Sequence, residues 1–306
     1  MTSLTEKYIN PFTDFGFKKL FGSEVNKDIL LDFLNELIKD QGKITDIQYL
    51  KNEQLRRSEW DRKAIFDIYC QNERGEKFIV EMQRAKQKYF KDRSVYYSSF
   101  PIQEQAKAGD WDFELKAVYL VGILDFVFEE DKNDSDPFSQ IEVQLMDIKR
   151  KKVFYDKLTF IYLELPKFNK KEEELESHFD KWMYVLKNLP LLAARPARLQ
   201  ERVFERLFAT AEILKFSKAE IIDYEDSLKV YRDLKNTMDY AIEFSAVENF
   251  AKGEAKGLAE GMEKGIEKRN AEITQNLNKK GFSISEIAEF TGLSKNKISE
   301  ILNHNK

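Results

Sequence analysis

Two short apolar runs on either side of a polar turn constrain the fold of this chain more than any other feature. Residues 65–71 and 76–83 are rich in β-branched and aromatic residues, and Asn-Glu-Arg-Gly lies between them at positions 72–75. This order predicts a β-hairpin. Side chains at positions i and i+2 share one face of a strand, so Glu81 and Gln83 should point to one face while the apolar residues between them fill the other.

The predicted hairpin brings two carboxylates together. If its register places Asp67 opposite Glu81, their oxygens converge on one point. Two like charges at one point are unfavourable unless a cation neutralises them. Oxygen ligands suit Mg²⁺ or Mn²⁺ better than zinc, and the softer ligands of the chain are only Cys70, His178 and His304. The pair therefore predicts a divalent metal site, and the alternative is two surface carboxylates on a solvent-facing strand.

Several segments together resemble the PD-(D/E)XK nuclease superfamily, and within it the recombination-promoting nuclease and putative transposase family. Besides the carboxylate hairpin, the sequence NPFTDFGFKKLFG at residues 10–22 is similar to the opening of that family. Residues 89–97, YFKDRSVYY, resemble the helix that follows its catalytic strands. A third likeness is to the glycine-spaced tail of the family, which matches the spacing of Gly253, Gly257, Gly261 and Gly265.

The resemblance implies a metal-dependent DNA endonuclease that hydrolyses phosphodiester bonds and promotes recombination or is linked to mobile DNA. Asp67 and Glu81 would hold Mg²⁺ or Mn²⁺ together with the Met82 carbonyl, and Asp14 would act through water or complete the coordination. The cation would polarise a phosphodiester oxygen and lower the pKa of a bound water. The lysine usual after the second acid is Gln83 here, which would position that water but supplies no positive charge, so slow cleavage is expected.

Two of the implied residues have structural alternatives. Arg93 lies on the predicted helix beside several tyrosines and could neutralise a DNA phosphate, since guanidinium presents a bidentate fork. A solvated ion pair with a carboxylate is the ordinary alternative for a helix-surface charge. Asp14 could instead cap the helix that carries Phe17, because Asp is a favourable N-cap residue.

Composition predicts a soluble, cytoplasmic protein without a membrane segment. The chain has 306 residues, and its 42% hydrophobic and 34% charged content excludes a disordered or membrane-spanning class. No apolar run approaches the roughly 20 residues of a membrane helix, and the first residues lack a signal-peptide core. One cysteine allows no internal disulfide. The net charge of −4 means that DNA affinity must come from local basic patches.

The apolar periodicity along the chain predicts an α/β core followed by helices. Residues 1–170 contain, in order, a helix, the hairpin, a helix and further strands, as in a PD-(D/E)XK restriction-endonuclease-like core. The further strands are expected at 117–124, 141–146 and 158–165. Residues 171–246 have a helical pattern throughout and predict a helical subdomain over the sheet. We expect its aromatic residues to form core and not the wall of a DNA groove; they include Phe204, Phe208 and Phe216.

Residues 247–277 predict a C-terminal helical tail of unusual composition. Glycine recurs every four residues among charged residues and alanine, and each interior glycine costs about 1 kcal/mol relative to alanine. A marginal helix that serves as a linker is one interpretation. Close packing on another helix, including that of a second subunit in a homodimer, is the other.

The last segment, residues 278–306, resembles a helix-turn-helix. Ser283 and Glu286 form a capping-box pattern, and Gly292 supplies the turn. Candidate DNA contacts at the start of the second helix are Lys295, Asn296 and Lys297. The segment has five lysines against three glutamates, so it is only mildly basic, and a packing or oligomerisation unit is the alternative.

Two classes of function follow from these features. The first is an active DNA endonuclease, and a nuclease acting in phage defence is a variant of it. The second is a catalytically weak or inactive DNA-binding or regulatory protein on a nuclease fold. The presence of Asp67, Glu81 and Gln83 favours the first class, because acids without a structural role should be lost when chemistry decays. The residue pattern does not separate recombination from phage defence, or DNA from RNA as substrate.

Overall fold

A six-stranded mixed β-sheet in the order β1-β4-β5-β6-β8-β7 organises the first of two compact units, Met1–Asn236. The computed structural model describes residues 6–39, 42–51, 53–54, 64–106, 112–132 and 139–303. The sheet contains β1 (Ile47–Tyr49), β4 (Ile68–Asn72), β5 (Lys77–Gln83), β6 (Val118–Leu124), β7 (Gln140–Asp147) and β8 (Lys152–Glu164). A separate antiparallel pair consists of β2 (Glu53–Gln54) and β3 (Ala64–Ile65).

The expected hairpin and the three further strands are all present. β4 and β5 are antiparallel, β5, β6 and β8 run parallel, and β7 pairs antiparallel with β8 at the edge. Every residue of β6 is buried, as the continuous apolar sequence of a central parallel strand requires. β8 begins at Lys152, earlier than expected from the sequence, because its first half pairs with β7.

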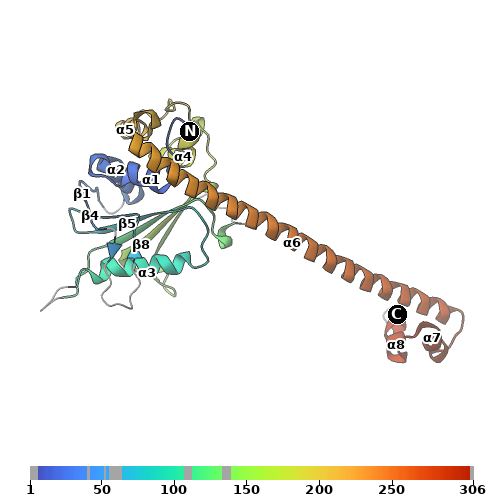
Figure 1. Cartoon of the computed structure of the whole chain (residues 1–306). Helices are drawn as coiled ribbons and strands as arrows, with labels where there is room; N and C mark the ends of the chain where they lie inside the picture. The colour runs from blue at the N-terminus through green and yellow to red at the C-terminus, as the bar shows by residue number, and fades with distance from the viewer. Residues whose placement is uncertain are drawn as a thin grey trace. The chain divides into compact units, whose positions relative to one another are not determined.

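Helices cover both faces of the sheet (Figure 1). One face carries α1 (Asp14–Phe21), α2 (Lys27–Leu37), α4 (His178–Asn188) and α5 (Arg202–Ala211), whose apolar residues share a core with Val80, Val121 and Ile161. α3 (Phe90–Gln103) covers the other face, where Phe90 packs with Ile79 and Leu120. Short 3₁₀ segments are η1 (Glu24–Asn26), η3 (Glu129–Asp131), η4 (Leu165–Lys167), η5 (Glu172–Glu174), η6 (Leu189–Leu191) and η7 (Ile213–Lys215).

The region that follows the sheet is helical, but with interruptions that the sequence pattern did not indicate. Residues 192–201 form no helix. Pro190 precedes this segment and Pro196 lies in it, and proline lacks the N–H that the interior of a helix needs. Phe204 and Phe208 are buried, and Phe216 packs against the same core while partly exposed. The prediction that these aromatic residues form core is confirmed.

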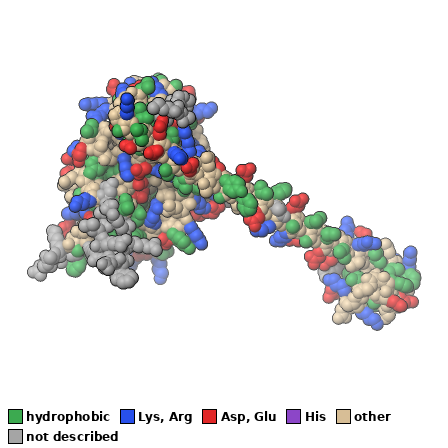
Figure 2. Space-filling view, viewed as in Figure 1, with side chains coloured by type: hydrophobic (Ala, Val, Ile, Leu, Met, Phe, Trp, Pro, Cys, Tyr) green, Lys and Arg blue, Asp and Glu red, His purple; other side chains and the backbone are tan. Residues whose placement is uncertain are grey.

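The second compact unit, Thr237–Lys306, is built from the end of α6 (Lys218–Lys279), α7 (Ile284–Thr291) and α8 (Lys295–Asn303). α7 begins with the predicted capping box, and Gly292 ends it with a φ of 70°. Ile287 and Ile298 are buried. Apolar side chains are exposed along this part of α6 (Figure 2). Among the described residues, no helix combines the length and the apolar character needed to cross a bilayer.

Candidate active site

The register of the β4–β5 hairpin brings the two predicted carboxylates together. Ile68 pairs with Val80, so Asp67, the residue before β4, lies opposite Glu81. The Asp67 backbone N–H donates to Glu81 Oε1 at 3.2 Å. The Met82 backbone N–H donates to Asp67 Oδ2 at 2.9 Å. Each carboxylate is therefore held by the backbone of the opposite strand, and the predicted register is confirmed.

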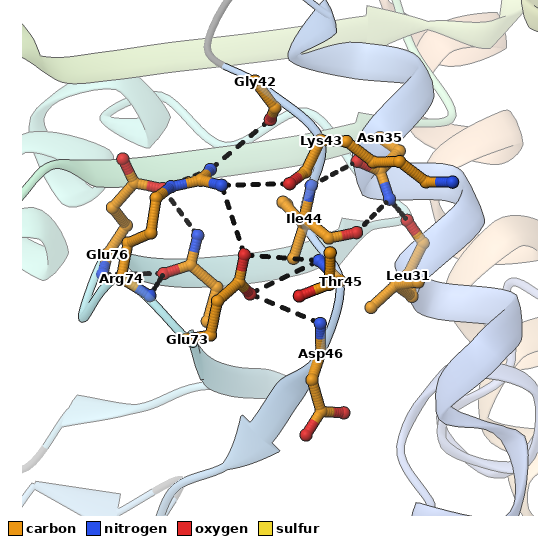
Figure 3. A network of polar contacts seen from close by, with 11 residues as sticks. Leu31, Asn35, Gly42, Lys43, Ile44, Thr45, Asp46, Glu73, Arg74 and Glu76 are labelled. Carbon is orange, nitrogen blue, oxygen red and sulfur yellow. Dashed lines mark hydrogen bonds and ion pairs between the residues drawn. The ribbon is translucent and has the colours of Figure 1, made fainter.

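A polar network ties the turn of this hairpin to the segment that precedes β1 (Figure 3). Arg74 donates to the Lys43 carbonyl at 3.0 Å and forms an ion pair with Glu76 at 2.8 Å. Glu73 accepts from the Thr45 backbone N–H at 3.3 Å. Because β1 itself pairs with β4, these contacts resist slippage of the hairpin, which would separate the two carboxylates.

Both carboxylates are in surroundings that disfavour their charge. Glu81 is 7% exposed, and burial raises its pKa, as does the charge of Asp67. Burial also raises the pKa of Asp67, and the charge of Asp14 adds to this effect while the Met82 N–H opposes it. Two adjacent acids of this kind resist being ionised together unless positive charge is supplied.

Asp14 is positioned by a turn that ends in a helix cap. The N-cap of α1 is Thr13, whose side chain accepts from the Gly16 N–H at 2.9 Å. The Thr13 hydroxyl in turn donates to the Asn10 carbonyl at 2.7 Å. Asp14 is thus the first residue of the helix, and the interpretation of Asp14 as the cap is wrong. Its carboxylate forms an ion pair with Lys18 at 3.0 Å.

A cavity of about 330 Å³ joins the ends of these elements. Asp14, Asp67 and Gln83 line it together, with Glu81 buried beside Asp67. Arg84 also lines it, and its charge acts to lower the pKa of Asp67. The sequence interpretation missed Arg84, although its place directly after Gln83 at the end of β5 was a usable signal.

Gln83 and Arg93 form a contact that the sequence interpretation did not foresee. Gln83 is 8% exposed, and its Oε1 accepts from one amino group of Arg93. The other amino group of Arg93 donates to Gln87 Oε1 at 2.6 Å. Arg93 therefore donates to two side-chain amides that line the cavity.

The remaining candidate residues lie in the second unit. Lys295, Asn296 and Lys297 are exposed on the first turn of α8. The Lys297 backbone N–H donates to Ser294 Oγ at 3.3 Å, as in a helix cap. These residues are together on one turn, as the sequence predicts.

The donor chemistry of the site fits a hard divalent cation. Glu81 is a buried carboxylate, Asp67 is a partly buried one, and Asp14 adds negative charge near Asp67. Oxygen donors of this kind suit Mg²⁺ or Mn²⁺, whose charge would offset theirs. Within the described ranges, no three His, Cys, Asp or Glu side chains are grouped closely enough to hold a metal as they stand. Side-chain adjustment would accompany binding.

The fold and the site together define a PD-(D/E)XK nuclease core, with a carboxylate hairpin joined to parallel strands between two helical layers. The family model for PD-(D/E)XK nuclease family transposases matches residues 11–241, and the chain belongs to this family. No curated protein and no solved structure matches the chain. Membership supports a nuclease- or transposase-related role and implies DNA as the substrate. Nucleases of this class generally use divalent metals such as Mg²⁺.

Proposed function

We propose that this protein is a Mg²⁺- or Mn²⁺-dependent endonuclease that hydrolyses phosphodiester bonds in DNA and acts in recombination or on mobile DNA. The observation that carries the proposal is the Asp67–Glu81 pair at the end of a nuclease-family hairpin, where Glu81 is buried and Asp67 lines a cavity together with Asp14. Two adjacent acids with raised pKa values are costly to stability, and a cation-dependent reaction would explain why the chain carries them.

In this proposal, Asp67 and Glu81 would hold the cation with the Met82 carbonyl, and Asp14 would act through water or complete the coordination. When bound, the cation polarises the scissile phosphodiester and lowers the pKa of water. Gln83 orients the attacking water. Its Nε2 donates to the Ala85 carbonyl at 2.9 Å and its Oε1 accepts from Arg93, which leaves one N–H and one lone pair of the amide for water.

Positive charge for DNA comes from two places in the proposal. Arg84 lines the cavity beside the carboxylates and can face a phosphate there. In the second unit, Lys295, Asn296 and Lys297 present an exposed helix start of the kind that enters a major groove. The tail contacts would hold the substrate, and the carboxylate site would cut it.

The first test is nicking of supercoiled plasmid with Mg²⁺, Mn²⁺, Ca²⁺ or chelator. We expect cleavage with Mg²⁺ or Mn²⁺ and a loss of at least about 10²-fold in Glu81→Gln, because a neutral amide is a poorer ligand than a carboxylate. Glu142→Gln, which changes an exposed glutamate on β7 in the same way, is the matched control and should keep full activity. DNA binding in Ca²⁺ should persist in both variants.

Another outcome would favour the second class of function. Gln83 in place of lysine is the observation that supports a DNA-binding or regulatory protein without cleavage. If the wild type binds DNA but does not cleave it in the presence of any of these metals, the binding role replaces the endonuclease. If Glu81→Gln cleaves as fast as the wild type, the site is elsewhere.

A further inference from the structure

The positive charge that Gln83 lacks is present in the site, on a different element. We propose that Arg93 is a positioning residue that fixes the Gln83 amide and supplies, from α3, the cationic charge beside Glu81 that a lysine at position 83 would carry. The proposal rests on the endonuclease function proposed above and assigns Arg93 a role other than phosphate binding.

The contacts of Arg93 direct its guanidinium toward Gln83. One amino group donates to Gln83 Oε1 and the other to Gln87 Oε1 at 2.6 Å, so both ends of the fork are occupied. The guanidinium carbon lies 5.1 Å from the ring centroid of Phe90 and 5.5 Å from that of Tyr97. Cation–π contacts with two rings hold the group in place. An arginine fixed in this way is not free to follow a mobile DNA strand.

The layers of the fold explain why α3 can supply this charge. Odd-numbered residues of β5 face α3, since Ile79 belongs to the core on that side, and Phe78 and Val80 belong to the opposite core. Gln83 therefore points to the helix that carries Arg93. The sheet face shared by Glu81 and Gln83 is the face on which the guanidinium lies.

The charge of Arg93 also acts on Glu81. It lowers the pKa of that carboxyl, against the larger upward effect of burial. Arg84 acts in the same direction on Asp67. Two arginines thus compensate part of the negative charge of the acid pair, each beside a different acid.

The chemistry of arginine limits its role to positioning and charge. Guanidinium keeps its proton in proteins, so Arg93 can be neither a general acid nor a general base. By donating to Oε1, it fixes which end of the Gln83 amide is oxygen, and hence which end can donate to water. A neutral amide held by a fixed cation is a two-residue substitute for one lysine.

The test is a double-mutant cycle on Arg93→Gln and Gln83→Lys. We expect Arg93→Gln to lower kcat for plasmid nicking by about 10²-fold, because the Gln83 amide is no longer held and the fixed charge beside Glu81 is lost. DNA affinity in Ca²⁺ should not change. The double variant Gln83→Lys/Arg93→Gln should recover most of the lost rate, since the charge returns at position 83. Lys91→Gln, an exposed position on the same helix, is the matched control.

A second readout is independent of cleavage. Arg93→Gln should bind Mn²⁺ several-fold more tightly by calorimetry, since a nearby positive charge is removed, and the double variant should return to the wild-type affinity. A purely structural role would instead lower the melting temperature and weaken Mn²⁺ binding.

Three results would overturn the proposal. The first is a fall in DNA affinity equal to the fall in rate, which would make Arg93 a phosphate ligand. The second is a double variant as slow as Arg93→Gln alone. The third is unchanged Mn²⁺ affinity in Arg93→Gln. If the wild type itself cleaves nothing, the endonuclease proposal fails, and the Mn²⁺ series still decides the role of Arg93.

Discussion

The turn at residues 10–13 sets the position of Asp14, a predicted metal residue, and a glycine packs directly against this turn. The Asn10 carbonyl accepts from the Thr13 N–H at 3.1 Å and from the Thr13 hydroxyl, and this turn directs Asp14 into the helix. Gly16 lies directly against it. A Cβ at position 16 would be 2.1 Å from the Asn10 oxygen and 2.6 Å from Thr13 Oγ1, closer than atoms can approach.

Gly16→Ala should therefore destabilise the first unit and slow cleavage. The added methyl forces the backbone of the turn to move, which typically costs about 1–3 kcal/mol, and the shift displaces Asp14 from the cavity. Urea unfolding followed by tryptophan fluorescence measures the first effect, and nicking per folded molecule measures the second. Gly253→Ala, in the second unit, is the control, since no atom of the described residues lies within 4 Å of a Cβ there. Wild-type stability in Gly16→Ala would contradict this account of the turn.

Contacts between residues close in the sequence could be predicted from the sequence alone. The hairpin register follows from alternation and from the turn at residues 72–75, so Asp67 and Glu81 could be paired from the sequence. The Arg93–Gln83 contact could not be predicted from the sequence, because it depends on how α3 packs on the sheet. The alternative that Asp14 caps the helix is wrong, because Thr13 and Asp14 are both good cap residues and only the backbone geometry separates them.

At the scale of elements, α6 is the least expected structure. It runs without interruption from Lys218 to Lys279 and so includes the glycine-spaced segment. Its first turns pack on the core through Tyr224 and Leu228. Farther along, no described atom lies within 4 Å of the Cβ positions of Gly253, Gly257, Gly261 and Gly265. The sequence suggested a change at residue 247 because composition changes there, but neither proline nor a turn breaks the helix.

The glycines of α6 allow a prediction that separates a linker from a helix pair. In a linker, Gly257→Ala and Gly261→Ala should each stabilise the helix by about 1 kcal/mol, because alanine has the higher helix propensity and the space is open. We expect this result, measured as a later loss of circular dichroism at 222 nm on heating the full chain. The oligomeric state in sedimentation should not change.

A homodimer would give the opposite result for the same substitutions. Leu258, Met262 and Ile266 are exposed beside the glycines and could meet a second copy. Close helix packing over glycine would then be disrupted by each added methyl. A dimer in the wild type that dissociates in Gly257→Ala would show that the glycines face a partner helix.

At the scale of the whole molecule, the family and the structure divide the chain at nearly the same place. The family match covers residues 11–241, and the first compact unit ends at Asn236. That unit contains both helical layers, the sheet and the complete carboxylate site. The fold class could be read from the order of elements in the sequence. The helices α2, α4 and α5 are brought together by contacts between residues far apart in sequence, which no local pattern specifies.

One of these long-range contacts should make the stability of the first unit depend on pH. His178 on α4 and Trp182 one turn later both bond to the Asp32 carboxylate on α2, the indole at 2.9 Å. The bond to Asp32 raises the pKa of His178 above its usual 6.5. The folded unit therefore holds the proton more tightly than the unfolded chain does, and protonation stabilises it.

The stabilisation should be fully present below pH 6.5 and should decline as the pH rises through the raised pKa of His178. His178→Gln keeps a neutral donor at every pH and removes the titration. We expect the difference in unfolding free energy between wild type and His178→Gln to be larger at about pH 5.5 than at about pH 8.5, by urea unfolding with tryptophan fluorescence. A difference that is equal at both values would show that the charge of His178 does not hold α4 to α2.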